Sequence, residues 1–271
     1  MVQFASTTVA LLCWAGYVLA ACNYGTSYFP REPNVTVGSF GYTGLNGPLN
    51  WYGLNKTANK LCATGRHQSP ININASIPTS SDGFVSFKID SYPEGAVFEN
   101  LGTTLEVPAN GTLVTDSKTY GLTQFHFHTP SEHRIELEHF PMEAHFVFEA
   151  DDKSVAVVAF VIDLGPADPW LTSVFTYVAG IKTPGQATLT GPLSFTNLEH
   201  HLKSNPIYRY SGSLTTPPCT EGVAWIISNK PLYIDAGTYN KVKNVLGFNA
   251  RYTQNFPGGV NLLQNAADEL K

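Results

Sequence analysis

Two short stretches decide how this chain folds: Gln-Phe-His-Phe-His at residues 124–128 and Glu-Ala-His-Phe-Val at residues 143–147. Successive side chains of a β-strand point to opposite faces, so His126 and His128 share one face and the two phenylalanines share the other. We expect the second stretch to pair with the first as an antiparallel neighbour, which places His145 opposite the histidine pair. The pattern predicts a sheet on which three imidazoles meet.

Three imidazoles that converge on one point are typical of a catalytic Zn²⁺ site. Such a site has three protein ligands and leaves the fourth tetrahedral position to water, whereas a structural zinc is normally closed by four ligands. The other histidines have no such neighbours. We interpret them as surface residues or as residues that support the metal ligands: His67, His133, His139, His200 and His201.

The composition favours one globular domain that does not bind nucleic acid. The chain has 271 residues, enough for a substantial core, and no linker or repeat divides it. Only 14% of the residues are charged, and the formal net charge of −5 offers no basic patch to nucleic acid. The 23 glycines and 18 prolines are spread evenly, as expected when turns join many short strands.

Most of the expected elements are strands. Strands are predicted at residues 84–89, 104–107, 122–128, 142–149, 155–162 and 223–228. Asp151-Asp152 predicts a hairpin turn that makes two of these strands antiparallel neighbours. Caps and apolar spacing predict helices at 168–180 and 235–247. The predicted fold class is mainly β, with a few short peripheral helices around a mostly antiparallel sheet.

The first residues predict a secreted protein. Residues 8–21 are apolar and end in small residues, which indicates a signal peptide over residues 1–21, although no Lys or Arg precedes Arg31. This stretch is too short to span a membrane. Leu19-Ala-Ala-Cys22 also resembles a bacterial lipoprotein cleavage box, but four Asn-x-Ser/Thr sequons favour a eukaryotic secretory route. The candidate glycosylation sites are Asn34, Asn55, Asn74 and Asn110.

Cysteine usage agrees with an oxidising compartment. Cys13 leaves with the signal peptide, and Cys22 lies at its edge. Cys62 and Cys219 remain in the body of the chain and most simply form one disulfide, the alternative being two buried free thiols. If cleavage leaves Cys22 in place, that thiol offers a route to a homodimer.

Several separated motifs make the chain similar to the α-class carbonic anhydrases, zinc enzymes that interconvert carbon dioxide and bicarbonate. The motifs keep the family's order and spacing: Phe40-Gly-Tyr42, Asn46-Gly-Pro48 with Trp51, Gln68-Ser-Pro70-Ile71, the histidine cluster, and Ser213-Leu-Thr-Thr-Pro-Pro218. The resemblance implies one catalytic domain over residues 40–265, around a large, twisted, mostly antiparallel sheet. Residues 22–39 are then an N-terminal segment and residues 266–271 a C-terminal tail.

The resemblance also implies roles for single residues at the metal. His126, His128 and His145 match the three zinc ligands. Gln124 and Glu143 match the partners that accept hydrogen bonds from the ligand rings and fix their orientation.

The rest of the implied site surrounds the fourth metal position. Thr215 matches the hydroxyl that accepts a hydrogen bond from zinc-bound hydroxide, and Glu132 matches the carboxylate that accepts from Thr215. Tyr42 and Thr216 match members of a water network. The apolar wall for substrate corresponds to Val147, Val157, Leu214, Val223 and Trp225. The implied reaction is reversible hydration of carbon dioxide to bicarbonate and a proton, by attack of zinc-bound hydroxide.

The chain departs from the family pattern on the route for the proton. Many members carry a histidine shuttle at the position that Thr103 occupies here. A threonine hydroxyl has no pKa near neutrality and cannot store a proton. Leu101 and Glu106 also replace residues that are usually Asn or Gln near the cavity. We expect turnover to be limited by proton export.

Two other functions remain open on the sequence. His126-x-His128 followed by Glu132 also resembles the first metal motif of cupins, in which Glu132 would bind iron or manganese, but no second cupin motif surrounds His145. A non-catalytic binding protein of the same fold is the other alternative. Such relatives have typically lost a ligand histidine, and this chain keeps all three.

Overall fold

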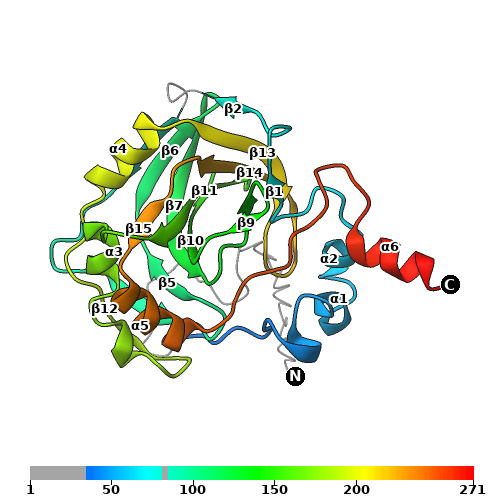
Figure 1. Cartoon of the computed structure of the whole chain (residues 1–271), viewed down its shortest axis with the longest axis horizontal. Helices are drawn as coiled ribbons and strands as arrows, with labels where there is room; N and C mark the ends of the chain where they lie inside the picture. Colours follow the sequence, from blue (N-terminus) through cyan, green and yellow to red (C-terminus); the bar gives the residue numbers. More distant parts are fainter. Residues whose placement is uncertain (1–34, 81–84) are drawn as a thin grey trace, which may run out of the picture.

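The structure is a computed structural model that describes residues 35–80 and 85–271, and it confirms the mainly β fold (Figure 1). Within the described residues, twelve strands form one large twisted sheet, most of it in the order β12-β4-β5-β7-β10-β11-β14-β13-β2. The signal peptide, Cys22 and Asn34 fall outside the described residues.

The strands of the large sheet are β2 (Thr79–Ser80), β3 (Val85–Ile89), β4 (Val97–Asn100), β5 (Leu105–Pro108), β6 (Gly111–Thr115), β7 (Lys118–His128), β10 (Met142–Glu149), β11 (Val155–Leu164), β12 (Ala187–Leu189), β13 (Ile207–Ser213), β14 (Glu221–Ser228) and β15 (Leu232–Ile234). A small second sheet contains β1 (Asn72–Ile73), β8 (Arg134–Ile135) and β9 (Glu138–His139). The helices are η1 (Gly44–Asn46), α1 (Trp51–Leu54), α2 (Lys60–Thr64), α3 (Pro169–Val174), η3 (Val178–Gly180), α4 (Thr196–Ser204), α5 (Ala236–Leu246) and α6 (Leu262–Glu269).

Antiparallel pairing dominates the sheet, as predicted. The Asp151-Asp152 turn joins β10 to β11 as an antiparallel hairpin, and β7 pairs with β10 in the same sense. Two neighbours of β11 are exceptions, because β14 and β15 both run parallel to it. The centre of the sheet is therefore mixed. No helix in the described part of the chain is long and apolar enough to cross a membrane.

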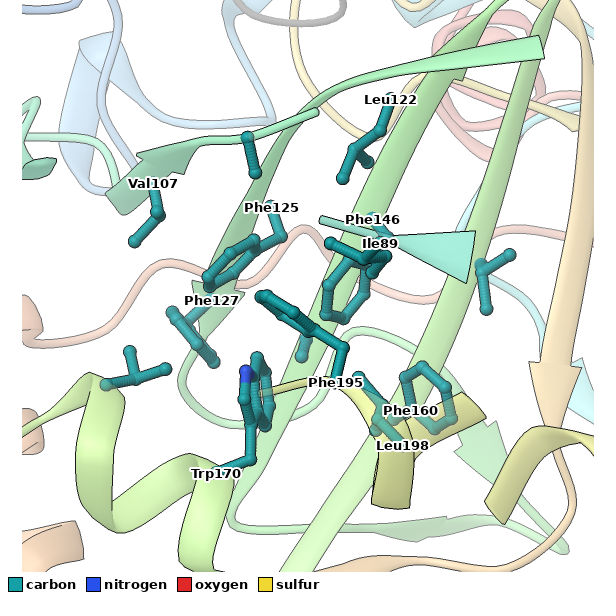
Figure 2. Packing of buried hydrophobic residues seen from close by; sticks show 14 of the residues in the cluster. Ile89, Val107, Leu122, Phe125, Phe127, Phe146, Phe160, Trp170, Phe195 and Leu198 are labelled. Carbon is teal, nitrogen blue, oxygen red and sulfur yellow. The ribbon is translucent and has the colours of Figure 1, made fainter. Parts of the chain in front are cut away.

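One face of the central strands carries a large aromatic core. Phe125 stacks on Phe146 with ring centroids 4.9 Å apart, and Phe127 contacts Phe175 at 4.7 Å. Figure 2 shows Trp170 of α3 and Phe195 packed among the same rings. Helices α3, α4 and α5 cover this side of the molecule in Figure 1. The aromatic face fixes the strands, so their other face is held in place for the site.

One of the two predicted helices is confirmed, and the other is shorter than predicted. Helix α5 follows the prediction, with Asp235 as its N-cap. The helix predicted over 168–180 is too long, because α3 ends at Val174 and only the short turn η3 follows. The Thr176 hydroxyl donates to the carbonyls of Thr172 and Ser173, and this competes with continued helical pairing.

The disulfide between Cys62 of α2 and Cys219 is formed, with Cα atoms 5.1 Å apart. Both residues are fully buried beside Trp51 and Phe40. The bond joins positions 157 residues apart and anchors the segment that follows Thr215.

Replacing Cys62 and Cys219 together by serine should lower the free energy of unfolding. On the chain-entropy model, closing so long a loop contributes at most about 5 kcal/mol. Equilibrium unfolding in urea measures the change. Reductant should lower the urea midpoint of the wild type and leave the midpoint of the double variant unchanged. A wild-type midpoint that ignores reductant would contradict the prediction.

Candidate metal centre

The pairing of β7 with β10 brings the three predicted histidines together. His126 lies directly opposite His145 in the register, and His128 lies opposite Glu143. All three imidazoles are buried, and they form a group whose ligand nitrogens lie within 4.8 Å of one another. The predicted convergence of the histidines is therefore present in the structure.

Each ring nitrogen that faces away from the group has a hydrogen-bond acceptor. His126 Nδ1 donates to Gln124 Oε1 at 2.8 Å, and His128 Nδ1 donates to the Asn249 carbonyl at 2.8 Å. His145 uses its other nitrogen, Nε2, to donate to Glu143 Oε1 at 2.8 Å. A neutral imidazole carries one N–H, so the remaining nitrogen of each ring presents a lone pair to the centre.

The charge state of the rings suits metal binding. Burial lowers the pKa of His128 to about 4. Burial and the neighbouring rings hold the pKa of His126 well below its usual range, and burial also lowers the pKa of His145. Neutral imidazole is the form that binds a metal.

The spacing of the lone pairs fits zinc. His126 Nε2 and His128 Nε2 lie 3.1 Å apart, although neither atom carries a proton to share. Two ligands of a tetrahedral zinc, each bonded at 2.0–2.1 Å, are separated by about 3.3 Å. A cation between these nitrogens removes the repulsion of their lone pairs, so the donor set fits the ion that the sequence predicts.

Glu143 links His145 to His133 and to the backbone of residues 132–133. The sequence predicted only its contact with a ligand ring. Its Oε1 accepts from His145 and, at 2.7 Å, from His133 Nδ1, while Oε2 accepts the backbone N–H groups of Glu132 and His133. Burial alone raises the pKa of Glu143, but the two histidines outweigh it and hold that pKa well below its usual range. Because these bonds occupy the carboxylate, His133 supports the ligand set and is not a surface residue.

Glu132 is fully buried between the metal ligands and the C-terminal segment. Its Oε1 accepts the Arg251 backbone N–H at 2.8 Å, and its Oε2 lies 3.5 Å from His128 Nε2. Burial raises the pKa of Glu132 to about 7, and a hydrogen bond from the Thr215 hydroxyl is one of the interactions that oppose this rise. Thr215 thus lies near Glu132, whose Oε2 has no hydrogen-bond partner among the described residues.

The predicted apolar wall forms one cluster. Val147 pairs with Val157 across β10 and β11, and Val157 pairs with Trp225 on β14. The Trp225 ring also packs on His145, with centroids 4.9 Å apart. All the residues predicted for this wall belong to one buried group: Val147, Val157, Leu214, Val223 and Trp225.

The remaining predicted residues lie around this centre. Tyr42 is half-buried against Phe40 and Trp51, and burial together with the Glu132 charge raises its pKa well above the usual range. Thr216 is buried next to Thr215 in the chain.

Thr103 is buried, with 3% of its surface exposed. A Cβ on Gly38 would lie 2.6 Å from its methyl carbon, so the segment before Phe40 packs directly on it. Glu106 is also buried, and it lies opposite His126 in the register of β5 and β7. His67 is exposed and its backbone N–H donates to Glu221. The position expected for a shuttle is therefore covered by the chain itself.

Three supporting residues had no signal that sequence reasoning could use. Asn249 acts on His128 through its backbone carbonyl, and Arg251 acts on Glu132 through its backbone N–H. Tyr210 contacts His133 through its hydroxyl at 2.6 Å. The two backbone contacts do not depend on residue type, and Tyr210 lies 77 residues from His133 in the sequence, so only the fold reveals these contacts.

Comparison with known proteins identifies the family of this chain. The model of the eukaryotic-type carbonic anhydrase family matches residues 46–265. A carbonic anhydrase of Neisseria gonorrhoeae is 38% identical over 212 residues, which cover 77% of this chain and 81% of that protein.

Solved structures agree with this relationship. A fungal α-carbonic anhydrase from Aspergillus oryzae is similar with a TM-score of 0.82 and 48% identity, over 85% of this chain and 99% of that one. An α-carbonic anhydrase from Thermovibrio ammonificans, in complex with the inhibitor sulfanilamide, has a TM-score of 0.72 and 35% identity, over 80% of this chain and 95% of that one. The chain therefore belongs to the α-class, eukaryotic-type carbonic anhydrases, enzymes that hydrate carbon dioxide.

Proposed function

We propose that this enzyme hydrates carbon dioxide reversibly with a zinc ion held by His126, His128 and His145. The observation that carries the proposal is the set of three neutral imidazoles, each with one nitrogen tied to a partner and the other turned to a common point. When bound, zinc lowers the pKa of a bound water to about 7, a value known from carbonic anhydrases themselves. Membership of this family leaves no support for the cupin alternative.

Thr215 and Glu132 would select and orient the oxygen nucleophile. The Thr215 hydroxyl has one proton, and donation to the nearby Glu132 carboxylate would use that proton. Its lone pairs are then left to accept a hydrogen bond. An O–H group satisfies this acceptor, and the lone pair of that oxygen is then free for attack on carbon. A cation at the histidines would also keep Glu132 ionised, since a nearby positive charge lowers a carboxyl pKa.

The apolar cluster would receive the substrate. Carbon dioxide is small and has no net charge, so it needs a water-poor surface and no ion pair. Val147, Val157 and Trp225 provide such a surface on the strands that also carry or contact His145. Bicarbonate is charged and gains little from this surface, which favours its exchange for water.

We propose that the protein acts after secretion. The Cys62–Cys219 disulfide suits an oxidising compartment. Within the described residues, the sequon asparagines Asn55, Asn74 and Asn110 are all exposed, as glycan attachment requires. Cleavage near residue 21, a catalytic domain over 40–265 and a dimer through Cys22 complete this proposal, which mass spectrometry of the secreted protein and a non-reducing gel can test.

Replacing His128 by alanine should remove zinc and abolish hydration, because two imidazoles hold the metal weakly. Stopped-flow hydration and zinc analysis measure both effects, and a chelator should reproduce the loss in the wild type. His200→Ala is the matched control, since His200 is exposed on α4 and should keep its metal and its rate. Full activity of His128→Ala with one zinc per chain would overturn the ligand assignment.

Thr215→Ala should keep zinc and lose about 10²-fold in kcat/KM, the scale of losing one preorganised hydrogen-bond partner. Thr215→Ser keeps the hydroxyl and should recover most of the rate. Zinc analysis of both variants separates metal loss from loss of orientation. Equal rates for alanine and serine would show that the hydroxyl does not orient the nucleophile.

Without a histidine at position 103, kcat should be low in dilute buffer and rise as imidazole buffer is added. The value of kcat/KM should stay nearly constant, because it reports the steps up to bicarbonate release and not the later transfer of a proton to solvent. Stopped-flow hydration across buffer concentrations measures both values. A kcat that is already high and indifferent to buffer would show that another group exports the proton.

A further inference from the structure

A cavity of about 350 Å³ lies beside the metal centre; Tyr42 lines it, but none of the three histidine ligands does. Its lining is mostly apolar and comes from the turn around η1, the start of β8 and the segment after α5. Leu49 and Phe248 line it with 70% and 57% of their surfaces exposed, while Ala250 is buried. Cavities that bind small molecules range from about 300 to 1,000 Å³, so this one suits a small ligand.

One side of the cavity carries an arginine with free donors. Arg134 Nε donates to His139 Nε2 at 2.8 Å, and both residues line the cavity. His139 Nδ1 donates to the Ser131 carbonyl, so its Nε2 is the acceptor nitrogen. Within the described residues, no hydrogen bond or ion pair occupies either Nη group of Arg134. The guanidinium is thus held at Nε. Its two free Nη groups can donate two parallel hydrogen bonds to the oxygens of a carboxylate.

Polar groups beside the cavity also lack partners. The hydroxyls of Tyr252 and Thr253 are shielded from solvent and have no hydrogen-bond partner among the described residues, and both residues line the cavity. Shielded polar groups in folded proteins are normally satisfied.

We propose that this cavity binds a small amphiphilic carboxylate, with its head on the Nη groups of Arg134 and its apolar body against Leu49 and Phe248. A cationic donor edge beside exposed apolar side chains complements a ligand with these two parts. In the described part of the chain, the acidic neighbours Glu136 and Glu138 form no ion pair with Arg134, so the guanidinium charge is available. The cavity also borders the metal centre, because Arg251 lines it and its backbone N–H donates to Glu132.

The probe for this site is 3-phenylpropionate, whose binding can be followed by calorimetry. Carboxylates also bind metals, so the titration is made on zinc-loaded protein and again after chelation. We expect the cavity site to be saturable with the same affinity in both forms, apart from any separate binding at the metal in the zinc-loaded form. Acetate lacks the apolar body and 3-phenylpropanamide lacks the charge, and each should bind at least tenfold more weakly. Binding that vanishes on chelation would place the probe on the metal and overturn the proposal.

Variants test the two halves of the site. Arg134→Gln should weaken binding of 3-phenylpropionate at least tenfold. Arg134→Lys should bind the probe with an affinity between those of the wild type and Arg134→Gln, because lysine keeps the charge but cannot donate two parallel hydrogen bonds. Leu49→Ser should weaken binding of 3-phenylpropionate and leave that of acetate unchanged. Arg66→Gln is the charge-matched control, since Arg66 is exposed and donates to Gly258 outside the cavity. Thermal melts confirm that each variant folds, and unchanged affinity in folded Arg134→Gln would refute the proposal.

Discussion

The site depends on one constraint, the register between β7 and β10. A shift of one residue turns every side chain of a strand to its other face. Here such a shift would move His145 into the core and Phe146 to the face that carries His126 and His128. Phe146 stacks on Phe125 across the same strand pair, so the aromatic face and the histidine face specify the same register. The core therefore holds the ligands in position from the opposite side of the sheet.

Buried charge is the second constraint on this centre. Glu132 and Glu143 are both fully buried, and isolated buried carboxylates are costly. Glu143 is stabilised by two histidines and two backbone N–H groups, which hold it ionised. Glu132 has fewer donors, and its pKa rises to about 7. Their hydrogen bonds thus distinguish the two carboxylates and suit them to the different roles proposed above, orientation of the ligand rings for Glu143 and acceptance from Thr215 for Glu132.

Period-two alternation predicted the strands that matter most, because the pattern at residues 124–128 and 143–147 is strong and local. The disulfide was also predictable, since few cysteines remain in the body of the chain. Helix α4 was missed because its helical signal is confined to Leu198 and Leu202, four residues apart, and strand β13 was missed because its buried and exposed residues do not alternate. The parallel pairing of β14 with β11 could not be predicted either. A connection of about sixty residues separates the two strands, and no local sequence pattern indicates that they pair. His133 showed the same limit, because its contacts with Glu143 on a different strand and with Tyr210, which lies 77 residues further along the chain, form only in the fold.

The position of β14 gives the two halves of the site different origins. The three histidines come from strands that follow one another closely along the chain, so only short loops must close to assemble them. The substrate wall is completed by Trp225 and Val223, which reach the sheet after a long excursion through α3, α4 and β13. Loop-closure entropy rises with the length of chain enclosed. The C-terminal half that completes this wall also supplies the Asn249 carbonyl to His128 and the Arg251 N–H to Glu132. Damage to that half of the domain would therefore remove the pocket and loosen the histidine centre together, although the three histidines lie far upstream in the chain.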